Sequence, residues 1–210
     1  METNNLKIRI TFTEDVLGTA SKNPDIHREF IASKAPNALS MEEEVDAIGT
    51  EAMMEKSMTG FPRTEDGHPF LYDYQVKGFF KDTCAVLRKV PGSKCSKIKA
   101  YKKEIDGLLF VYPRKILMNM DGEMTICERP LRAQTMQGER IALSSSEAAP
   151  AGTYIDLEIE CLTKDMYELA IECLENGKRR GLGQWRNSGK GRFGCVVRRG
   201  DKVLLDTLRG

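Results

Sequence analysis

The chain has 210 residues, which is long enough to bury a sizeable hydrophobic core in one large domain or two small ones. Its 32 Lys and Arg residues are nearly balanced by 31 Asp and Glu residues, so the net charge of +1 supports no argument for binding to nucleic acid or membrane. Hydrophobic residues make up 40% and charged residues 30%, which excludes a disordered tail and is typical of a water-soluble globular protein.

No segment has the pattern of a membrane span or a secretion signal. The longest uninterrupted apolar run, residues 108–112, is far shorter than the roughly 20 residues that a membrane helix needs. Residues 1–5 lack both the basic start and the apolar stretch of a signal peptide. We therefore expect a cytoplasmic protein with no membrane partner.

The six cysteines are spread singly along the chain, without a Cys-x-x-Cys pair, and both histidines, His27 and His68, stand far from them. This spacing does not fit a structural zinc site. We expect reduced cysteines, no metal and no cofactor. Cys161, Cys173 and Cys195 lie among periodic apolar residues, which indicates small buried side chains.

The first half of the chain predicts a strand, an insertion and a helix. Residues 6–12 alternate between apolar and polar side chains, as a half-buried strand does. Residues 13–73 are too long for a plain loop, so we interpret them as an insertion with short helices at 25–32 and 40–56. Apolar residues spaced by three and four then predict an amphipathic helix over 74–89.

Two strands and a second insertion follow. Residues 108–112 are apolar throughout and predict a buried strand, which continues past Pro113 through residues 116–118. Residues 119–152 contain an Asp-Gly turn, a hairpin arm at 140–143 and a connector rich in Ser, Ala, Pro and Gly. We interpret them as the second insertion.

The last third has the clearest periodicity. Residues 155–161 alternate as a strand, and Thr163 is placed to cap a helix that Gly177 would end. Strands are expected at 193–197 and 202–205. Strand, helix, strand, strand, helix, strand is the order of a ferredoxin-like (RRM-like) α+β fold, an antiparallel sheet with two helices on one face. We expect one such domain over residues 1–210.

The densest functional signal is the segment of residues 181–194, called here the glycine loop. Between Lys178 and Arg199 there are eight basic residues and no acidic one, which predicts attraction of phosphates. Glycines allow positive φ and let backbone amides approach an anion, while a tryptophan can stack on a base. The residues expected to bind RNA here are Gly181, Gly183, Trp185, Arg186, Gly189, Lys190, Gly191 and Arg192.

A second basic region runs from residue 77 to residue 103, with nine bases against one acid, Asp82. In the expected fold, both basic regions belong to connections around the helices and can meet on one side of the domain. Together they would make a groove for a polyanion, to which Lys77 and Lys81 would contribute.

Three segments carry a family resemblance. The pattern Gly-Leu-Gly, five residues, Gly-Lys-Gly over residues 181–191 resembles the C-terminal glycine-rich loop of the RAMP superfamily (repeat-associated mysterious proteins), the RNA-binding proteins of CRISPR systems. Residues 73–81 resemble the segment that opens the first helix in the backbone subunits of type III CRISPR effectors. The opening strand, followed by residues 17–21, is similar to that family's strand and glycine turn.

The resemblance implies binding of single-stranded RNA through its phosphates, with other protomers or CRISPR-type effector subunits as partners, in antiviral defence. Two alternatives stay open. One is a metal-independent endoribonuclease that processes guide RNA, for which His27, Asp25 and Asp15 are the candidate residues, although no catalytic residue is assigned. The other is a phage or mobile-element protein that engages host defence machinery through a RAMP-like fold.

Overall fold

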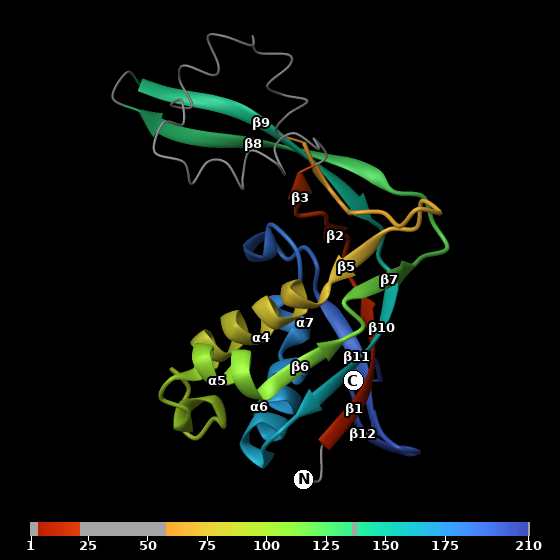
Figure 1. Ribbon diagram of the computed structural model, residues 1–210. Helices are drawn as coiled ribbons and strands as arrows, with labels where there is room; N and C mark the ends of the chain where they lie inside the picture. The colour runs from red at the N-terminus through yellow and green to blue at the C-terminus, as the bar shows by residue number, and fades with distance from the viewer. Residues whose placement is uncertain (1–3, 22–57, 136–137, 210) are drawn as a thin grey trace, which may run out of the picture.

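A computed structural model describes residues 4–21, 58–135 and 138–209 of the chain. The fold is α+β, with an antiparallel sheet and several helices (Figure 1). Among the described residues, no helix combines the length and the apolar character needed to cross a membrane. The helices expected at 25–32 and 40–56 lie outside the described residues.

The larger sheet has seven strands, in the order β12-β11-β1-β10-β7-β5, with β6 also pairing with β10. Its strands are β1 (Asn4–Phe12), β5 (Phe70–Tyr72), β6 (Leu109–Tyr112), β7 (Lys115–Asn119), β10 (Tyr154–Cys161), β11 (Phe193–Arg199) and β12 (Lys202–Asp206). All its pairings are antiparallel. The sheet has three strands beyond the four of the expected fold: β12, expected at 202–205, β7, expected as a continuation of the strand before Pro113, and β5, not expected from the sequence.

Strands β6 and β7 follow one another along β10. Strand β6 pairs with Glu158 to Cys161, and β7 pairs with Tyr154 and Ile155. Pro113 and Arg114 stand between them, and a proline has no N–H to donate to a neighbouring strand. The strand expected to run through Pro113 is therefore interrupted there, as its residue type requires.

Helices cover one face of this sheet (Figure 1). They are α4 (Asp73–Leu87), α5 (Tyr101–Leu108), α6 (Lys164–Glu175) and α7 (Gly177–Arg180), with short 3-10 turns η1 (Cys95–Lys97) and η2 (Arg186–Ser188). Alternate residues of β1, from Leu6 to Phe12, are buried in the core with Val76 and Phe80 of α4. Lys7 and Arg9 of β1 are exposed on the opposite face.

The helix expected after residue 163 is confirmed, but its end differs from the prediction. Thr163 caps α6 by accepting a hydrogen bond from the backbone N–H of Met166, at 3.2 Å. Gly177 does not end this helix and instead begins α7. The glycine is needed for packing, because a β-carbon there would lie 2.2 Å from the buried ring of Phe193.

A second sheet lies above the first in Figure 1. It contains β2 (Val16–Leu17), β3 (Ala20–Ser21), β4 (Thr59–Gly60), β8 (Thr125–Thr135) and β9 (Gly138–Ala149), in the order β2-β9-β4-β3, with β8 pairing with β9. Strands β8 and β9 form a long hairpin inside the segment expected to be the second insertion. The two expected insertions thus meet each other, since β2, β3 and β4 come from the first.

Candidate nucleic-acid interface

The glycine loop is closed on itself at its base. The backbone N–H of Leu182 donates to the carbonyl of Gly191 at 2.8 Å, and Gly191 N–H donates to the carbonyl of Asp15 at 2.8 Å. Gly191 has a φ of +70°, and a β-carbon there would lie 1.8 Å from the carbonyl oxygen of Leu182. Gly181 and Gly191 are buried, so these two predicted RNA-binding residues shape the loop from inside.

The tip of the loop leaves several backbone amides available. Gly189 N–H donates to the carbonyl of Arg186 at 3.0 Å. Among the described residues, the backbone amides of residues 183–187 have no hydrogen-bond acceptor. Consecutive amides without an acceptor are candidates for binding an anion.

Two acidic residues from distant segments pair with Arg180, which precedes the loop, and with the loop residues Arg186 and Lys190. Arg186 and Lys190 are called here the inner cations. Arg180 donates to Asp82 of α4 from Nε at 2.6 Å, and Arg186 donates to the same carboxylate from Nη1 at 2.9 Å. Lys190 Nζ lies 2.7 Å from Asp15 Oδ2. The segment without acids in the sequence therefore has acids beside it in space.

These ion pairs keep both carboxylates charged. The hydrogen bond from Arg180, with the nearby charge of Arg186, holds the pKa of Asp82 below its ordinary value against the opposing effect of burial. The hydrogen bond from Lys190 lowers the pKa of Asp15 in the same way, and that of Lys190 is raised. The pairs therefore fix the loop in place at neutral pH.

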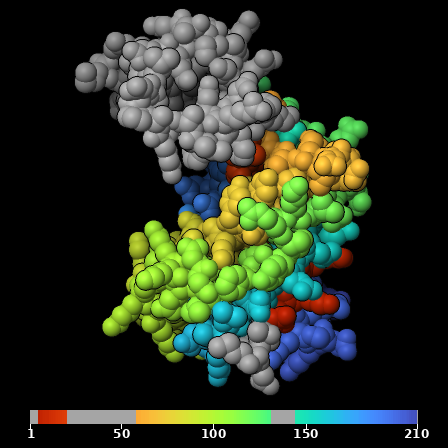
Figure 2. All heavy atoms as spheres, in the orientation of Figure 1, coloured from red at the N-terminus to blue at the C-terminus, as the bar shows by residue number. Residues whose placement is uncertain are grey.

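Three further cations in and beside the loop, Lys178, Arg179 and Arg192, are exposed to solvent and are called here the outer cations. Arg192 is exposed, and no carboxylate of a described residue is within ion-pair distance of it. Gly189 lies beside it with a φ of +87°, and a β-carbon there would make an ordinary contact with the guanidinium carbon of Arg192, at 3.5 Å. Lys178 and Arg179 of α7 are also exposed. Figure 2 shows the C-terminal part of the chain, in blue, reaching the surface beside the yellow residues of α4.

Gln184 and Trp185 join the glycine loop to the second sheet. Gln184 Nε2 donates to the carbonyl of Gly18 at 3.0 Å and to Thr59 Oγ1 at 3.2 Å. Trp185 is 42% exposed, and its ring centroid lies 5.2 Å from the guanidinium carbon of Arg129 in β8. Sequence reasoning did not single out Arg129, because nothing in its own segment distinguishes it from an exposed strand residue.

Lys77 and Lys81 lie on a different side of α4 from the loop contact. Lys77 Nζ donates to the carbonyl of Asp106 in α5 at 3.1 Å, and Lys81 Nζ lies 2.5 Å from the Asp106 carboxylate. Helix α4 does meet the glycine loop, but not through Lys77 and Lys81. It does so through Asp82, which pairs with Arg186, and through Phe79, whose ring centroid lies 5.1 Å from that of Phe193.

The candidate catalytic residues are not brought together. His27 and Asp25 lie outside the described residues. Asp15 is described, and its carboxylate is occupied by Lys190 and by the backbone N–H of Ala151 at 3.3 Å. Within the described part of the chain, no group of three or more His, Cys, Asp or Glu residues is arranged to hold a metal ion.

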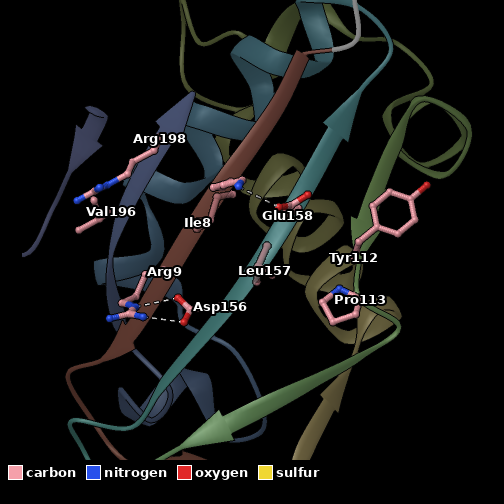
Figure 3. Close-up of a pocket in the computed structure, with 10 residues that line it drawn as sticks. Ile8, Arg9, Tyr112, Pro113, Asp156, Leu157, Glu158, Val196 and Arg198 are labelled. Atoms are coloured by element: carbon pink, nitrogen blue, oxygen red, sulfur yellow. Dashed lines mark hydrogen bonds and ion pairs between the residues drawn. The ribbon is translucent and has the colours of Figure 1, made fainter. Parts of the chain in front are cut away.

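The open face of the larger sheet carries both basic and acidic side chains. A concavity of about 860 Å³ lies there, lined by Lys7, Arg9, Asp156, Glu158 and Arg198 among others. Figure 3 shows the side chains that line it. Arg9 donates two hydrogen bonds to Asp156, at 2.8 and 2.7 Å, and Lys7 lies 3.8 Å from Glu158. Because these cations are paired with neighbouring carboxylates, this face attracts phosphates less than the outer part of the glycine loop does.

Comparison with known proteins supports the fold. No family model matches the sequence, and no curated protein matches it. Among solved structures, the chain is similar to one chain of an assembly described as "Cryo-EM structure of the Type III-B Cmr-beta bound to cognate target RNA", with a TM-score of 0.54 and 10% sequence identity. The match covers 97% of this chain and 61% of that chain. At this identity the similarity shows a shared fold alone.

Proposed function

We propose that this chain is an RNA-binding protein of the RAMP type, built as one ferredoxin-like domain with insertions at about residues 13–73 and 119–152. The fold supports this through the chain order β1, α4, β6, β10, α6, β11, which is the order of a split βαβ unit. Within this set, β1 and β10 are central, with β11 beside β1 and β6 beside β10. Strands β5, β7 and β12 extend that unit.

The partners proposed are single-stranded RNA and the subunits of a CRISPR-type effector. The structural neighbour belongs to an RNA-bound type III-B assembly, and its similarity extends over 97% of this chain. Three sequence segments resemble RAMP proteins in the same order along the chain. A subunit of such an assembly would act in the cytoplasm, in antiviral defence.

The observation that carries this proposal is the shape and charge of the glycine loop. Asp82 and Asp15 hold its inner cations, so the loop keeps one conformation without a ligand. On that support, Arg192 has no carboxylate partner and the amides of residues 183–187 have no acceptor among the described residues. A prearranged set of donors binds phosphate oxygens with little loss of conformational entropy. The inner cations, Arg186 and Lys190, hold the loop in place and also add to the positive electrostatic potential that attracts phosphates.

The test is a binding titration of a fluorescently labelled single-stranded RNA, followed by anisotropy. Arg192→Gln removes an exposed phosphate ligand, and we expect about fivefold weaker binding from the loss of roughly 1 kcal/mol. Arg209→Gln is the matched control, because Arg209 is 89% exposed and, among the described residues, pairs with Asp206 alone, at 3.4 Å. Its affinity should equal that of the unmodified chain.

Two results would contradict the proposal. One is the absence of RNA binding by the unmodified chain at low salt. The other is equal affinity of Arg192→Gln and Arg209→Gln, since binding through general charge alone would respond to both changes alike.

A further inference from the structure

Arg129 of β8 is a buried cation whose hydrogen-bonding capacity is largely unused. It is 8% exposed, and its Nη2 donates to Gln184 Oε1 at 2.7 Å. Its Nε and Nη1 are buried and have no hydrogen-bond partner among the described residues. A guanidinium stays charged at every physiological pH, and a buried charge without a partner is strongly unfavourable. Such a group in a folded protein calls for an explanation.

The side chain that lies over Arg129 is itself unusual. Trp185 has a φ of 53° and is the one described residue other than glycine with a positive φ. A left-handed backbone at a bulky residue is strained, and such strain persists where the surrounding structure enforces it, often at binding sites. One face of the indole lies on the Arg129 guanidinium at 5.2 Å, yet 42% of the side chain is exposed.

Both residues lie where the β8–β9 hairpin meets the glycine loop. Gln184 connects these elements, since its amide oxygen accepts from Arg129 and its amide nitrogen donates to Gly18 and Thr59. Lys190 and Asp15 neutralise each other at the base of the loop. Among the described residues, the region around Arg129 therefore offers a cation without a carboxylate partner and an aromatic surface, next to the amides of residues 183–187, which have no acceptor.

We propose that Arg129, Gln184 and Trp185 form a nucleotide-binding site of the RNA surface. A backbone phosphate binds the Nε and Nη1 edge of Arg129, and the adjoining base stacks on Trp185. Because Nε and Nη1 are buried in the unbound chain, the groups that cover them must move as the phosphate enters. This inference rests on the proposed RNA-binding function and adds to it a site that includes the hairpin.

A purely structural role for Arg129 makes the opposite prediction about stability. If Arg129 serves only to anchor the hairpin, Arg129→Met removes a stabilising contact and lowers the melting temperature. If it is kept for a ligand, Arg129→Met replaces an unpaired buried charge with an apolar chain of similar length. The melting temperature then stays equal or rises while RNA affinity falls.

The experiment uses the full chain and the fluorescence of its single tryptophan. A labelled oligouridylate is titrated while anisotropy reports binding and tryptophan emission reports Trp185. We expect RNA to change the emission, and Arg129→Met to weaken binding by about tenfold or more without lowering the melting temperature. Trp185→Phe should keep most of the affinity and Trp185→Ala should lose it. Arg209→Met, which removes an exposed charge elsewhere, should bind RNA as the unmodified chain does.

The outcomes separate this inference from the proposed function. If anisotropy shows binding but emission is unchanged and Arg129→Met binds normally, the nucleotide site is refuted while RNA binding stands. A lower melting temperature of Arg129→Met, together with equal affinities of Trp185→Phe and Trp185→Ala, also overturns the inference in favour of a structural anchor. Absence of binding by the unmodified chain instead refutes the proposed function itself.

Discussion

The Asp82 ion pairs join α4 to Arg180 and to the glycine loop, and Asp82→Asn tests them directly. The carboxylate accepts from Arg180 at 2.6 and 3.2 Å and from Arg186 at 2.9 Å. Its side chain is 29% exposed, as is that of Arg186, so solvent screens these contacts only in part. Hydrogen bonds to charged groups contribute about 1.5–3 kcal/mol each before relaxation. We expect Asp82→Asn to lower the free energy of unfolding by about 2 kcal/mol, or the melting temperature by about 4–8 °C.

The stability difference between Asp82→Asn and the unmodified chain should also depend on pH in a definite direction. The pKa of Asp82 in the folded chain lies below its ordinary value of 3.8, chiefly because Arg180 donates to it. A group whose pKa is lowered by folding stabilises the fold above its unfolded pKa and loses that contribution as the pH falls through the folded value. The difference between the two proteins should therefore be full at pH 7 and shrink below about pH 4.

The assay is urea unfolding of both proteins at pH 7 and at several lower pH values, followed by circular dichroism. Asp156→Asn is the matched control, since Asp156 also accepts two hydrogen bonds from an arginine but is 52% exposed. Its effect should stay within about 1 kcal/mol. Equal stability of Asp82→Asn and the unmodified chain at pH 7, or a difference that does not shrink at low pH, would refute the reasoning.

Further predictions concern the backbone and the thiols. Gly191→Ala should cost about 2 kcal/mol or more in urea unfolding, because its β-carbon would lie 1.8 Å from a carbonyl oxygen at a φ of +70°. Gly78→Ala in α4, where a β-carbon would meet nothing within 4 Å, should stabilise the chain by about 1 kcal/mol; equal effects of the two variants would contradict the packing argument. With Ellman's reagent at pH 8, Cys127 should react first, because the other cysteines are buried and burial raises the pKa of Cys161 to about 12 and of Cys195 to about 11. Rapid reaction of several thiols in the folded chain would contradict this.

Local patterns in the sequence were sufficient to predict most elements of the larger sheet and its helices. The alternation at residues 155–161 and the spacing of three and four at 74–89 each report which side of an element is buried, and β10 and α4 occupy those positions. The Thr163 cap is a contact with Met166, three residues later, so it is visible in the sequence. These patterns involve residues that are only two to four positions apart in the sequence, so they can be recognised without knowledge of the fold.

The pairing of the loop cations could not be predicted in this way. Arg186 bonds to Asp82 across 104 positions, and Lys190 bonds to Asp15 across 175 positions. Neither acid lies in the basic segment, so charge counted along the sequence overstated the charge available in space. The glycines were correctly expected to adopt positive φ, but at Gly191 the cause includes a close approach to Leu182 that only the folded chain shows.

Arg129 illustrates the same limit for the candidate site. Its importance comes from burial, from the single hydrogen bond to Gln184 and from the position of Trp185, which are all long-range properties. The roles of Lys77 and Lys81 in RNA binding remain predictions. Both now have contacts with Asp106, so their charges are partly satisfied within the chain.

The most direct test of the central claim is the salt dependence of RNA binding by the unmodified chain and by Arg192→Gln. Arg192 is the better probe than Arg186 or Lys190, because those two residues also hold the loop through ion pairs. If the loop binds phosphates, the logarithm of the affinity falls linearly with the logarithm of the salt concentration, and Arg192→Gln reduces that slope by about 0.7. An affinity that does not respond to salt, or a slope that Arg192→Gln leaves unchanged, would contradict the account.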